Sequence, residues 1–396
     1  MAWNPLSNVE LNGKKILVRF DFNVPMEGEK ITDTTRIDSC LETIQHFLKS
    51  GAKKIIMMSH LGRPKGKVDL AYSLEPVATY LADKLNEEVT MTESCTDAGI
   101  KTLLGLPNTK IILLQNLRFH PQEEANDQDF AKILSSYGDI FVNDAFGTCH
   151  RKHASTHGVV KFFKTKDVFV GPLIQSEVSA LNNVLEAPKK PFISILGGAK
   201  VSDKIKIIKR LLPQVDHMLI GGAMAYPFLA AKGIEVGKSM CNEEDVKLAK
   251  MILNGSGKEK IRIPLDHVTS KSLDGNATQC KDQDIPADAI GLDIGERTIR
   301  EYSNLISQAK TVMWNGPMGL FEKEQFSNGT FALAKAISEN SDCFSLVGGG
   351  DSVNAINKSG LGSKISHIST GGGASLEFIE EGSLPGINAL KFGVQE

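Results

Sequence analysis

Short, uninterrupted runs of apolar residues recur along the first half of the chain. They cover residues 15–24 (KILVRFDFNV), 53–60 (KKIIMMSH), 110–117 (KIILLQNL) and 139–146 (DIFVNDAF). Continuous rather than alternating runs are typical of parallel strands that are covered on both faces. Segments with helical spacing lie between them, at 36–50, 74–86 and 123–137. The pattern predicts a strand–helix alternation.

The second half repeats this alternation. Its predicted strands are 191–198, 217–224, 261–268, 311–317, 343–350 and 365–370. A chain of 396 residues is long for one hydrophobic core, so two domains are expected. We therefore predict an α/β protein with two doubly wound parallel-sheet (Rossmann-like) domains and a cleft between them.

The predicted boundary lies within residues 170–191. This segment begins at Gly171-Pro172, and its apolar residues Leu173, Val178, Leu181 and Leu185 recur near helical spacing. Because it is not enriched in Gly and Ser, it indicates a linking helix at 171–187 rather than a flexible linker. The domains expected on either side are 1–170 and 188–375.

Composition narrows the possible partners. The formal net charge is −2, which argues against nucleic acid or a membrane surface as a partner reached by bulk electrostatics. The six cysteines are scattered and show no metal-ligand spacing, so reduced thiols are expected. The N-terminal residues show no secretory signal, and no apolar run is long enough to span a membrane.

Glycine is concentrated in the second half, directly after predicted strands. The segments are ILGGAK (195–200), LVGGGDS (346–352) and ISTGGGAS (368–375), and each is followed by a predicted helix. Bare backbone N–H groups at a helix start form a cradle for an anion. Three such turns in one domain predict a polyphosphate ligand.

Individual residues in these turns allow a simpler interpretation. Lys200 and Lys204 lie one turn apart, which favours an anion between them but also suits solvated lysines. Asp351 could hold Mg²⁺ beside phosphates, or Asp351 or Ser352 could only cap a helix, and local sequence does not decide between the two. Glu322 could accept ribose hydroxyls or simply be exposed.

Arginine has a different distribution. Four of the first five arginines, Arg36, Arg63, Arg118 and Arg151, follow strand-like or turn segments. Asp21 and Asn23 end one predicted strand, and His60 ends the next. Arginine binds carboxylate and phosphate through two parallel hydrogen bonds. A solvated basic loop remains possible for 150–153, but four strand ends with such residues predict one site for a small, multiply charged anion.

These segments together resemble the signature segments of the phosphoglycerate kinase family. The resemblance rests on VRFDFNVP, SHLGRP, the Leu-Arg of LLQNLRFH, DAFGTCHRKHAS, LGGAKVSDK, GGAMAY, WNGPMGLFE, GGGDS and STGGGASLE, in the family's order from about residue 18 to 378. The departures are Glu296-Arg297, Pro227 and Cys149, which lie outside the positions that the family uses for phosphate chemistry.

The resemblance implies reversible phosphoryl transfer between 1,3-bisphosphoglycerate and ADP, giving 3-phosphoglycerate and ATP, in a cytoplasmic monomer that uses Mg²⁺. It implies that residues 376–396 return to the first domain. It places the triose site at Asp21, Phe22, Asn23, Arg36, His60, Leu61, Gly62, Arg63, Arg118 and Arg151. It places the nucleotide site at Gly198, Lys200, Lys204, Gly291, Asn315, Glu322, Gly349, Gly350, Asp351 and Ser352, with Asp351 as metal ligand. The catalytic residues implied are Arg36, Lys200, Gly350 and Gly373.

The residue types suit this reaction because an acyl phosphate is already activated and needs no general base. Positioning and charge stabilisation remain, followed by domain closure that excludes water. Two other hypotheses stay open at this point: a related kinase with another anionic acceptor, and a nucleotide-binding protein without activity. The presence of Lys200 and Arg36 argues against the second.

Overall fold

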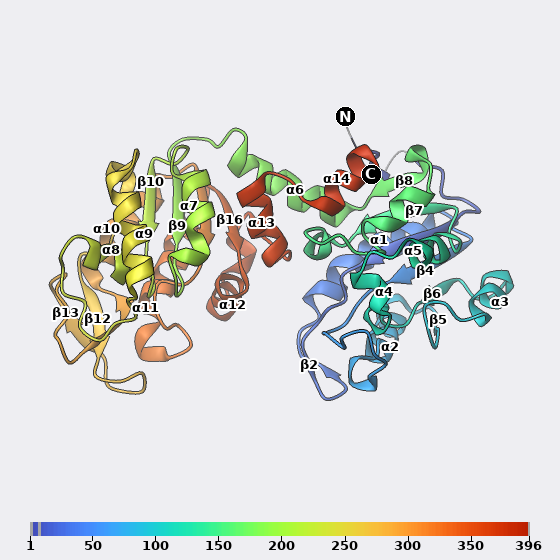
Figure 1. Cartoon of the computed structure of the whole chain (residues 1–396), viewed down its shortest axis with the longest axis horizontal. Helices are drawn as coiled ribbons and strands as arrows, with labels where there is room; N and C mark the ends of the chain where they lie inside the picture. Colours follow the sequence, from blue (N-terminus) through green and yellow to red (C-terminus); the bar gives the residue numbers. More distant parts are fainter. Residues whose placement is uncertain (1–2, 7–8, 395–396) are drawn as a thin grey trace. The chain divides into compact units, whose positions relative to one another are not determined.

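The computed structural model describes residues 3–6 and 9–394. The chain forms two compact units, Met1–Val178 with Ser383–Glu396, and Ser179–Gly382. Figure 1 colours the first unit blue to green, with the red C-terminal helix α14 (Pro385–Phe392) packed beside its strand β8 (Val168–Val170). The second unit runs from green through orange to red.

The first unit is built on a six-stranded parallel sheet of order β5–β6–β4–β1–β7–β8. The other strands of this sheet are β1 (Lys15–Phe20), β4 (Lys54–Met58), β5 (Val89–Met91), β6 (Ile111–Leu113) and β7 (Ile140–Asp144). All residues of β4, β6 and β7 are buried, as their continuous apolar runs predict. A small hairpin joins β2 (Met26–Glu27) to β3 (Lys30–Ile31).

The helices of this unit are α1 (Thr35–Lys49), α2 (Glu75–Leu85), α3 (Gly99–Gly105), α4 (Pro121–Glu124) and α5 (Gln128–Ser135), besides α14. The single helix predicted at 123–137 is wrong, because the chain breaks between α4 and α5. Asn126 has φ 55°, and the Asp127 carboxylate caps α5 by accepting the Phe130 N–H at 2.8 Å. The short strands β5 and β8 were not predicted.

The second unit has a parallel sheet of order β11–β10–β9–β15–β16–β17. The strands are β9 (Phe192–Leu196), β10 (His217–Ile220), β11 (Ile261–Arg262), β15 (Thr311–Asn315), β16 (Phe344–Gly348) and β17 (His367–Ile368). Trp314, fully buried in β15, lies in the hydrophobic core. The α/β class with two parallel-sheet units is confirmed.

Helices of the second unit connect these strands. They are α7 (Ile205–Leu211), α8 (Ala225–Ala231), α9 (Glu243–Asn254), α10 (Glu296–Gln308), α11 (Asn328–Glu339), α12 (Gly350–Ser359) and α13 (Gly373–Glu381). Short 3₁₀ helices occur in both units, at 70–72, 117–119, 146–148, 158–162, 165–167, 202–204, 258–260, 324–326 and 362–364.

The strand predicted at 261–268 is two strands in two different sheets. β11 ends at Arg262, and β12 (His267–Ser270) pairs in antiparallel fashion with β13 (Thr278–Cys280) and β14 (Ile290–Ile294). Pro264 lies between them and cannot donate a ladder hydrogen bond, so the run cannot continue as one strand. This three-stranded sheet was not predicted.

Residues 171–187 contain the helix α6 (Pro172–Leu185), which passes from the first unit into the second. Its first turn is held by Asp144 at the end of β7, whose Oδ1 accepts the N–H groups of Leu173 at 2.8 Å and Ile174 at 3.3 Å. The Thr43 hydroxyl donates to the other carboxylate oxygen at 2.9 Å. The helix is thus anchored to the carboxyl edge of the first sheet.

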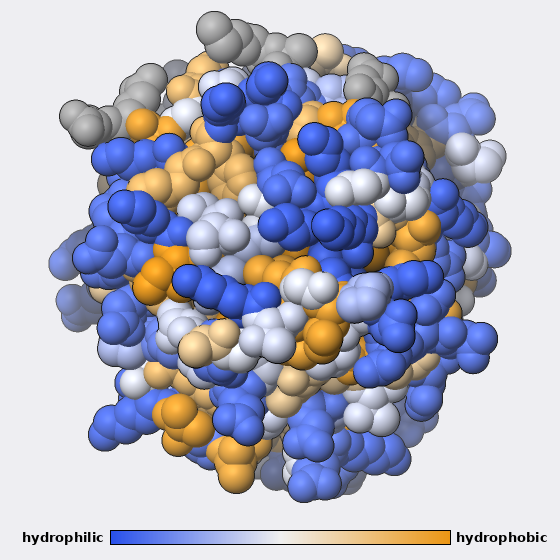
Figure 2. All heavy atoms as spheres, turned by 90° about the vertical axis from the view of Figure 1, so that its right-hand side faces the viewer, coloured by the Kyte–Doolittle hydropathy of each residue, from blue (hydrophilic) through white to orange (hydrophobic). Residues whose placement is uncertain are grey.

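The surface seen in Figure 2 is mostly hydrophilic, with apolar residues in small, separate groups. Across the described residues, no helix combines the length and the apolar character needed to cross a membrane.

Candidate active site

The first cluster of polar side chains lies at the carboxyl edge of the sheet in the first unit. Asp21 directly follows β1 and is buried, and its carboxylate lies 3.2 Å from the Arg36 guanidinium at the start of α1. The same Arg36 nitrogen donates to the Asn23 carbonyl oxygen at 2.9 Å. About a third of the Arg36 side chain stays exposed, so its remaining N–H groups can bind a ligand.

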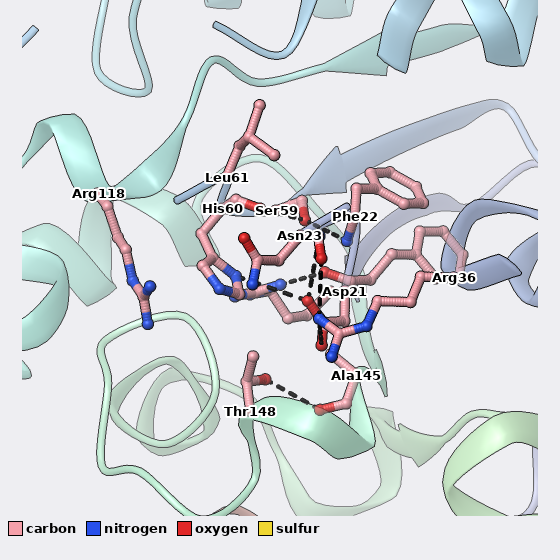
Figure 3. Close-up of polar contacts among 12 residues, drawn as sticks. Asp21, Phe22, Asn23, Arg36, Ser59, His60, Leu61, Arg118, Ala145 and Thr148 are labelled. Carbon is pink, nitrogen blue, oxygen red and sulfur yellow. Dashed lines mark hydrogen bonds and ion pairs between the residues drawn. The ribbon is translucent and has the colours of Figure 1, made fainter. Parts of the chain in front are cut away.

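The segment after β4 is hydrogen-bonded to this cluster. The Asn23 side-chain oxygen accepts the Gly62 N–H at 2.8 Å, and the Phe22 N–H donates to Ser59 at 2.8 Å. Gly62 has φ 61°, and a Cβ there would overlap the Tyr72 ring, so only glycine fits. Figure 3 shows Asp21, Asn23, His60, Leu61 and Arg36 gathered at this edge.

Arg118 reaches the cluster from the 3₁₀ helix after β6. Its guanidinium donates to the Gly62 carbonyl oxygen at 2.8 Å and lies 3.2 Å from the Glu124 carboxylate of α4. Arg118 lies on the other side of the His60 ring from Asp21 in Figure 3. The structure therefore brings Asp21, Asn23, His60 and Arg118 together with Arg36.

Arg63 and Arg151 are more peripheral. Both are exposed, on the loops after β4 and β7. The Arg151 Nε donates to the His150 ring at 3.0 Å. They follow β4 and β7, the strands on either side of β1, and among the described residues no hydrogen bond or ion pair joins either of them to Asp21 or Arg36.

Three buried residues behind the cluster escaped sequence analysis. Arg19, inside β1, is 1% exposed and donates to the Ser155 hydroxyl at 2.9 Å and to the His60 ring at 3.1 Å. The Ser155 hydroxyl in turn donates to Glu123 of α4 at 2.6 Å. A cation inside a continuous apolar strand is the signal that could have revealed them, because arginine is rarely buried without partners.

The histidines of this region are neutral. Burial and the nearby Arg19, Arg118 and Arg36 hold the pKa of His60 well below its usual value. Burial and Arg118 likewise lower the pKa of His153 to about 3. Positive charge at the site therefore comes from arginine at any physiological pH, which suits an anionic ligand.

The second cluster lies at the carboxyl edge of the parallel sheet in the second unit. Three neighbouring strands, β9, β15 and β16, end there in glycine-containing turns that are bonded to one another. The Gly197 N–H donates to the Asn315 carbonyl oxygen at 2.9 Å, and the Asn315 amide donates to the Gly348 carbonyl oxygen at 2.7 Å. Gly349 has φ 88°, and a Cβ there would crowd the Asn315 amide.

Two lysines follow the first of these turns. The Lys204 ammonium donates to the Asn315 side-chain oxygen, which brings it to the central strand end. Burial lowers the pKa of Lys204, while Asp203 and Asp351 act in the opposite direction. Lys200 is exposed. The Ser202 N–H just beyond it donates to the buried Asp245 of α9 at 2.8 Å, which anchors this loop.

Two helix starts complete the second cluster. Asp351 lies exposed in the first turn of α12, which begins at Gly350, and the buried Ser352 hydroxyl accepts the Gly316 N–H at 2.6 Å. α13 begins at Gly373, after the last strand of the same sheet. The free N–H groups of these first turns favour an anion.

Gly291 and Glu322 are not part of this strand-end cluster. Gly291 lies in β14 of the antiparallel sheet, where its N–H donates to Ser239 at 2.9 Å and a Cβ would overlap the Tyr226 hydroxyl. Glu322 is exposed on the loop after β15.

Comparison with known proteins identifies the family of the chain. The sequence model of the phosphoglycerate kinase family matches residues 6–382. The chain is similar to a phosphoglycerate kinase of Anaeromyxobacter dehalogenans, at 47% identity over 99% of this chain and 100% of that protein.

Two solved structures are also similar. One is the phosphoglycerate kinase of Coxiella burnetii, with a TM-score of 0.88 at 39% identity, covering 98% of this chain and 99% of that one. The other is the enzyme of Pyrococcus horikoshii, with a TM-score of 0.84 at 32% identity, covering 98% of both chains. Sequence, coverage and fold agree, and the chain belongs to the phosphoglycerate kinase family.

Proposed function

We propose that the cluster in the first unit binds the triose substrate and that the cluster in the second unit binds the nucleotide. The reaction is that of the family: this chain is a kinase that transfers a phosphoryl group reversibly between 1,3-bisphosphoglycerate and ADP, in glycolysis. In this proposal, triose binding belongs to residues 1–170 and nucleotide binding to 188–375. The cytoplasm as its location and a monomeric state are part of the same proposal.

The observation that carries the triose assignment is the convergence of arginines on one sheet edge. Arg36 and Arg118 meet His60 and Asn23 there, and Arg63 and Arg151 flank them on neighbouring loops. 3-Phosphoglycerate has a carboxylate at one end and a phosphate at the other, both of which suit guanidinium groups. Phe22, Leu61 and Gly62 supply the backbone that shapes this edge.

The nucleotide assignment rests on the bonded turns after β9, β15 and β16. Backbone N–H groups around Gly198, Gly349 and Gly350, with Lys204 beside Asn315, suit a chain of phosphates. Ser352 holds the turn after β15, and we assign Gly291 and Glu322 to the nucleoside part. Both ATP and ADP would bind this edge.

The reaction requires the protein to position the two substrates and to stabilise negative charge. The attacking carboxylate or ADP oxygen carries no proton to be removed, so charge on the transferring phosphoryl oxygens is what the site stabilises. We assign this task to Arg36 from the first unit and to Lys200 and the helix starts at Gly350 and Gly373 from the second. A guanidinium, an ammonium and N–H dipoles each counter negative charge.

Mg²⁺ fits this site as a companion of the nucleotide. Asp351 offers one exposed carboxylate beside the phosphate-binding turn, and Mg²⁺ is commonly held by one or two carboxylates plus the substrate phosphates. Its chemistry there would be to neutralise phosphate charge.

Asp351→Asn is expected to weaken Mg²⁺-ADP binding about tenfold and metal-free ADP binding hardly at all. The amide keeps the size of the side chain but loses the charge that attracts the cation, and no side chain caps α12, whose N-cap is Gly349. Calorimetric titration with and without Mg²⁺ measures the difference, with Asp282→Asn, an exposed carboxylate of the same unit, as the control. Equal weakening of both forms would mean that Asp351 is not a metal ligand.

Arg63→Met is expected to raise KM for 3-phosphoglycerate about tenfold and to leave KM for ATP unchanged, because one charged hydrogen bond to the triose is lost. The substitution is at an exposed side chain, so the fold is preserved. Initial rates in the 3-phosphoglycerate direction provide the measurement. Lys67→Met, an exposed cation on the same loop, is the matched control, and equal effects of the two variants would refute a specific role for Arg63.

A further inference from the structure

Arg19 is an arginine that is only 1% exposed beside the triose site, and the function above does not use it. It lies in β1, the strand between β4 and β7, in register with Met58 and Asn143. A guanidinium in such a position costs several kcal/mol unless each N–H group has a partner. The structure supplies hydrogen-bond partners for this guanidinium.

All three nitrogens of the Arg19 guanidinium have a partner, and its Nη1 donates to the Phe20 carbonyl oxygen. On one side, the Arg19 Nε donates to the Ser155 hydroxyl at 2.9 Å, and that hydroxyl donates to Glu123 Oε1 at 2.6 Å. The second Glu123 oxygen accepts the Ser155 N–H at 3.0 Å. On the other side, Arg19 Nη2 lies 3.1 Å from His60 Nδ1. Arg19, Ser155 and Glu123 are called the buried triad below.

The direction of the Arg19–His60 hydrogen bond determines which ring nitrogen of His60 carries the proton. A guanidinium has only donors and keeps its proton, so His60 Nδ1 must be the acceptor. A neutral imidazole that accepts at Nδ1 carries its proton on Nε2. His60 is then a neutral donor in a site already crowded with cations.

We propose that the buried triad positions His60 for the triose substrate, by holding its ring in the neutral Nε2–H form with Nε2 free to donate to a substrate oxygen. Arg19 acts through His60, so it is a positioning residue and not a catalytic one. The proposal rests on the proposed function, because it takes His60 to be a triose ligand.

The surroundings of His60 agree with this state. The charged groups that face it are Arg19 of β1, Arg36 of α1, Arg118 of the 117–119 helix and, with the opposite sign, Asp21 at 3.8 Å; His153 also contributes. Three cations and burial outweigh one carboxylate, and the pKa of His60 is well below its usual value. Removing Arg19 takes away both a cation and the donor to Nδ1, so the pKa of His60 should rise.

The first test is the nitrogen NMR spectrum of the substrate-free full chain, with the His60 signals assigned from a His60→Ala spectrum. In the wild type, His60 should show the Nε2–H form and should not titrate between about pH 5.5 and 8.5. In Arg19→Met the ring should no longer be held in the Nε2–H form, and it should begin to titrate at a higher pH than in the wild type, because a cation and the donor to Nδ1 are gone. An ordinary titration or an Nδ1–H ring in the wild type would overturn the proposal, as would an unchanged His60 in folded Arg19→Met.

The second test avoids the risk that Arg19→Met does not fold. Ser155→Ala removes one hydroxyl of the triad and should raise KM for 3-phosphoglycerate about fivefold, with kcat and KM for ATP within about twofold of wild type. The control is Thr148→Val, because Thr148 is also buried and its hydroxyl donates to the Ala145 carbonyl oxygen at 2.9 Å (Figure 3). A purely structural triad predicts a lower melting temperature with an unchanged KM, and that result would overturn the proposal.

Failure of the triose assignment would be seen in a different measurement. His60→Ala should raise KM for 3-phosphoglycerate at least as much as Ser155→Ala does. An unchanged KM would show that His60 is not a triose ligand and would remove the role given to the triad. The NMR result does not involve substrate, so it would still report whether Arg19 sets the state of the ring.

Discussion

Arg36→Ala is expected to lower kcat about a thousandfold or more, while ADP binding stays close to that of the wild type. This loss of kcat is of the size attributed to arginines that stabilise phosphoryl-transfer transition states in other enzymes. Arg36 belongs to the first unit, and the proposed nucleotide site belongs to the second, so loss of its side chain should not disturb ADP. Its guanidinium is held by Asp21 at 3.2 Å and by the Asn23 carbonyl oxygen at 2.9 Å. These two contacts fix the orientation of the guanidinium and of its remaining N–H donors.

Arg36→Lys should recover only part of the lost activity. A single ammonium cannot bond Asp21 and the Asn23 carbonyl oxygen and also offer a planar fork to the phosphoryl oxygens. Comparison of kcat and of KM for both substrates among wild type, Arg36→Ala and Arg36→Lys tests this, with Lys49→Ala at the other end of α1 as control. A near-normal kcat with only a raised KM for 3-phosphoglycerate would assign Arg36 to substrate binding alone.

Gly197→Ala is expected to weaken ADP binding about a hundredfold, which corresponds to the ~3 kcal/mol at the upper end of overpacking costs. A Cβ added at Gly197 would overlap the Pro317 carbonyl oxygen and would lie 2.7 Å from the Gly316 carbonyl oxygen. Both separations are shorter than 3.0 Å, the closest distance at which Cβ atoms normally contact other heavy atoms. Both obstacles are backbone atoms, so no side-chain rotation relieves the overlap. The turn after β9 must move away from the turn after β15, and this separates the groups proposed to bind phosphate.

Calorimetric titration with ADP, together with thermal unfolding, measures this effect. Gly255→Ala is the matched control, because a Cβ at Gly255 has its nearest atoms at 3.4 Å and the residue does not need a positive φ. Normal ADP affinity in Gly197→Ala would show that the turns after β9 and β15 need not touch for the nucleotide to bind.

The sequence predicted much of both sheets because parallel strands leave a local signature. β4, β7, β9 and β15 are completely buried, so each reads as an unbroken apolar run. β5, whose three residues are all only half-buried, lacks that signature. The antiparallel strands β12–β14 were missed because their pairing depends on contacts between distant segments.

The strand-end residues could be identified for a related reason. Asp21, His60 and Asn315 directly follow or end apolar runs, and the carboxyl ends of parallel strands share one edge whatever the details of packing. Residues of this kind are predictable from local order alone. Their roles toward the two substrates remain proposals that the variants above test.

The buried triad shows what local order could not reveal. Arg19 and Ser155 are separated by 136 positions, and Ser155 and Glu123 by 32, so no sequence spacing relates them. Sequence alone determined that this chain forms two parallel-sheet units, because the burial of a parallel strand on both faces and a glycine turn after it each leave a pattern within a few consecutive residues. Only the tertiary structure decided which buried side chains meet behind His60, because the cost of desolvating a charge is met by whichever partners the whole fold brings within hydrogen-bond distance.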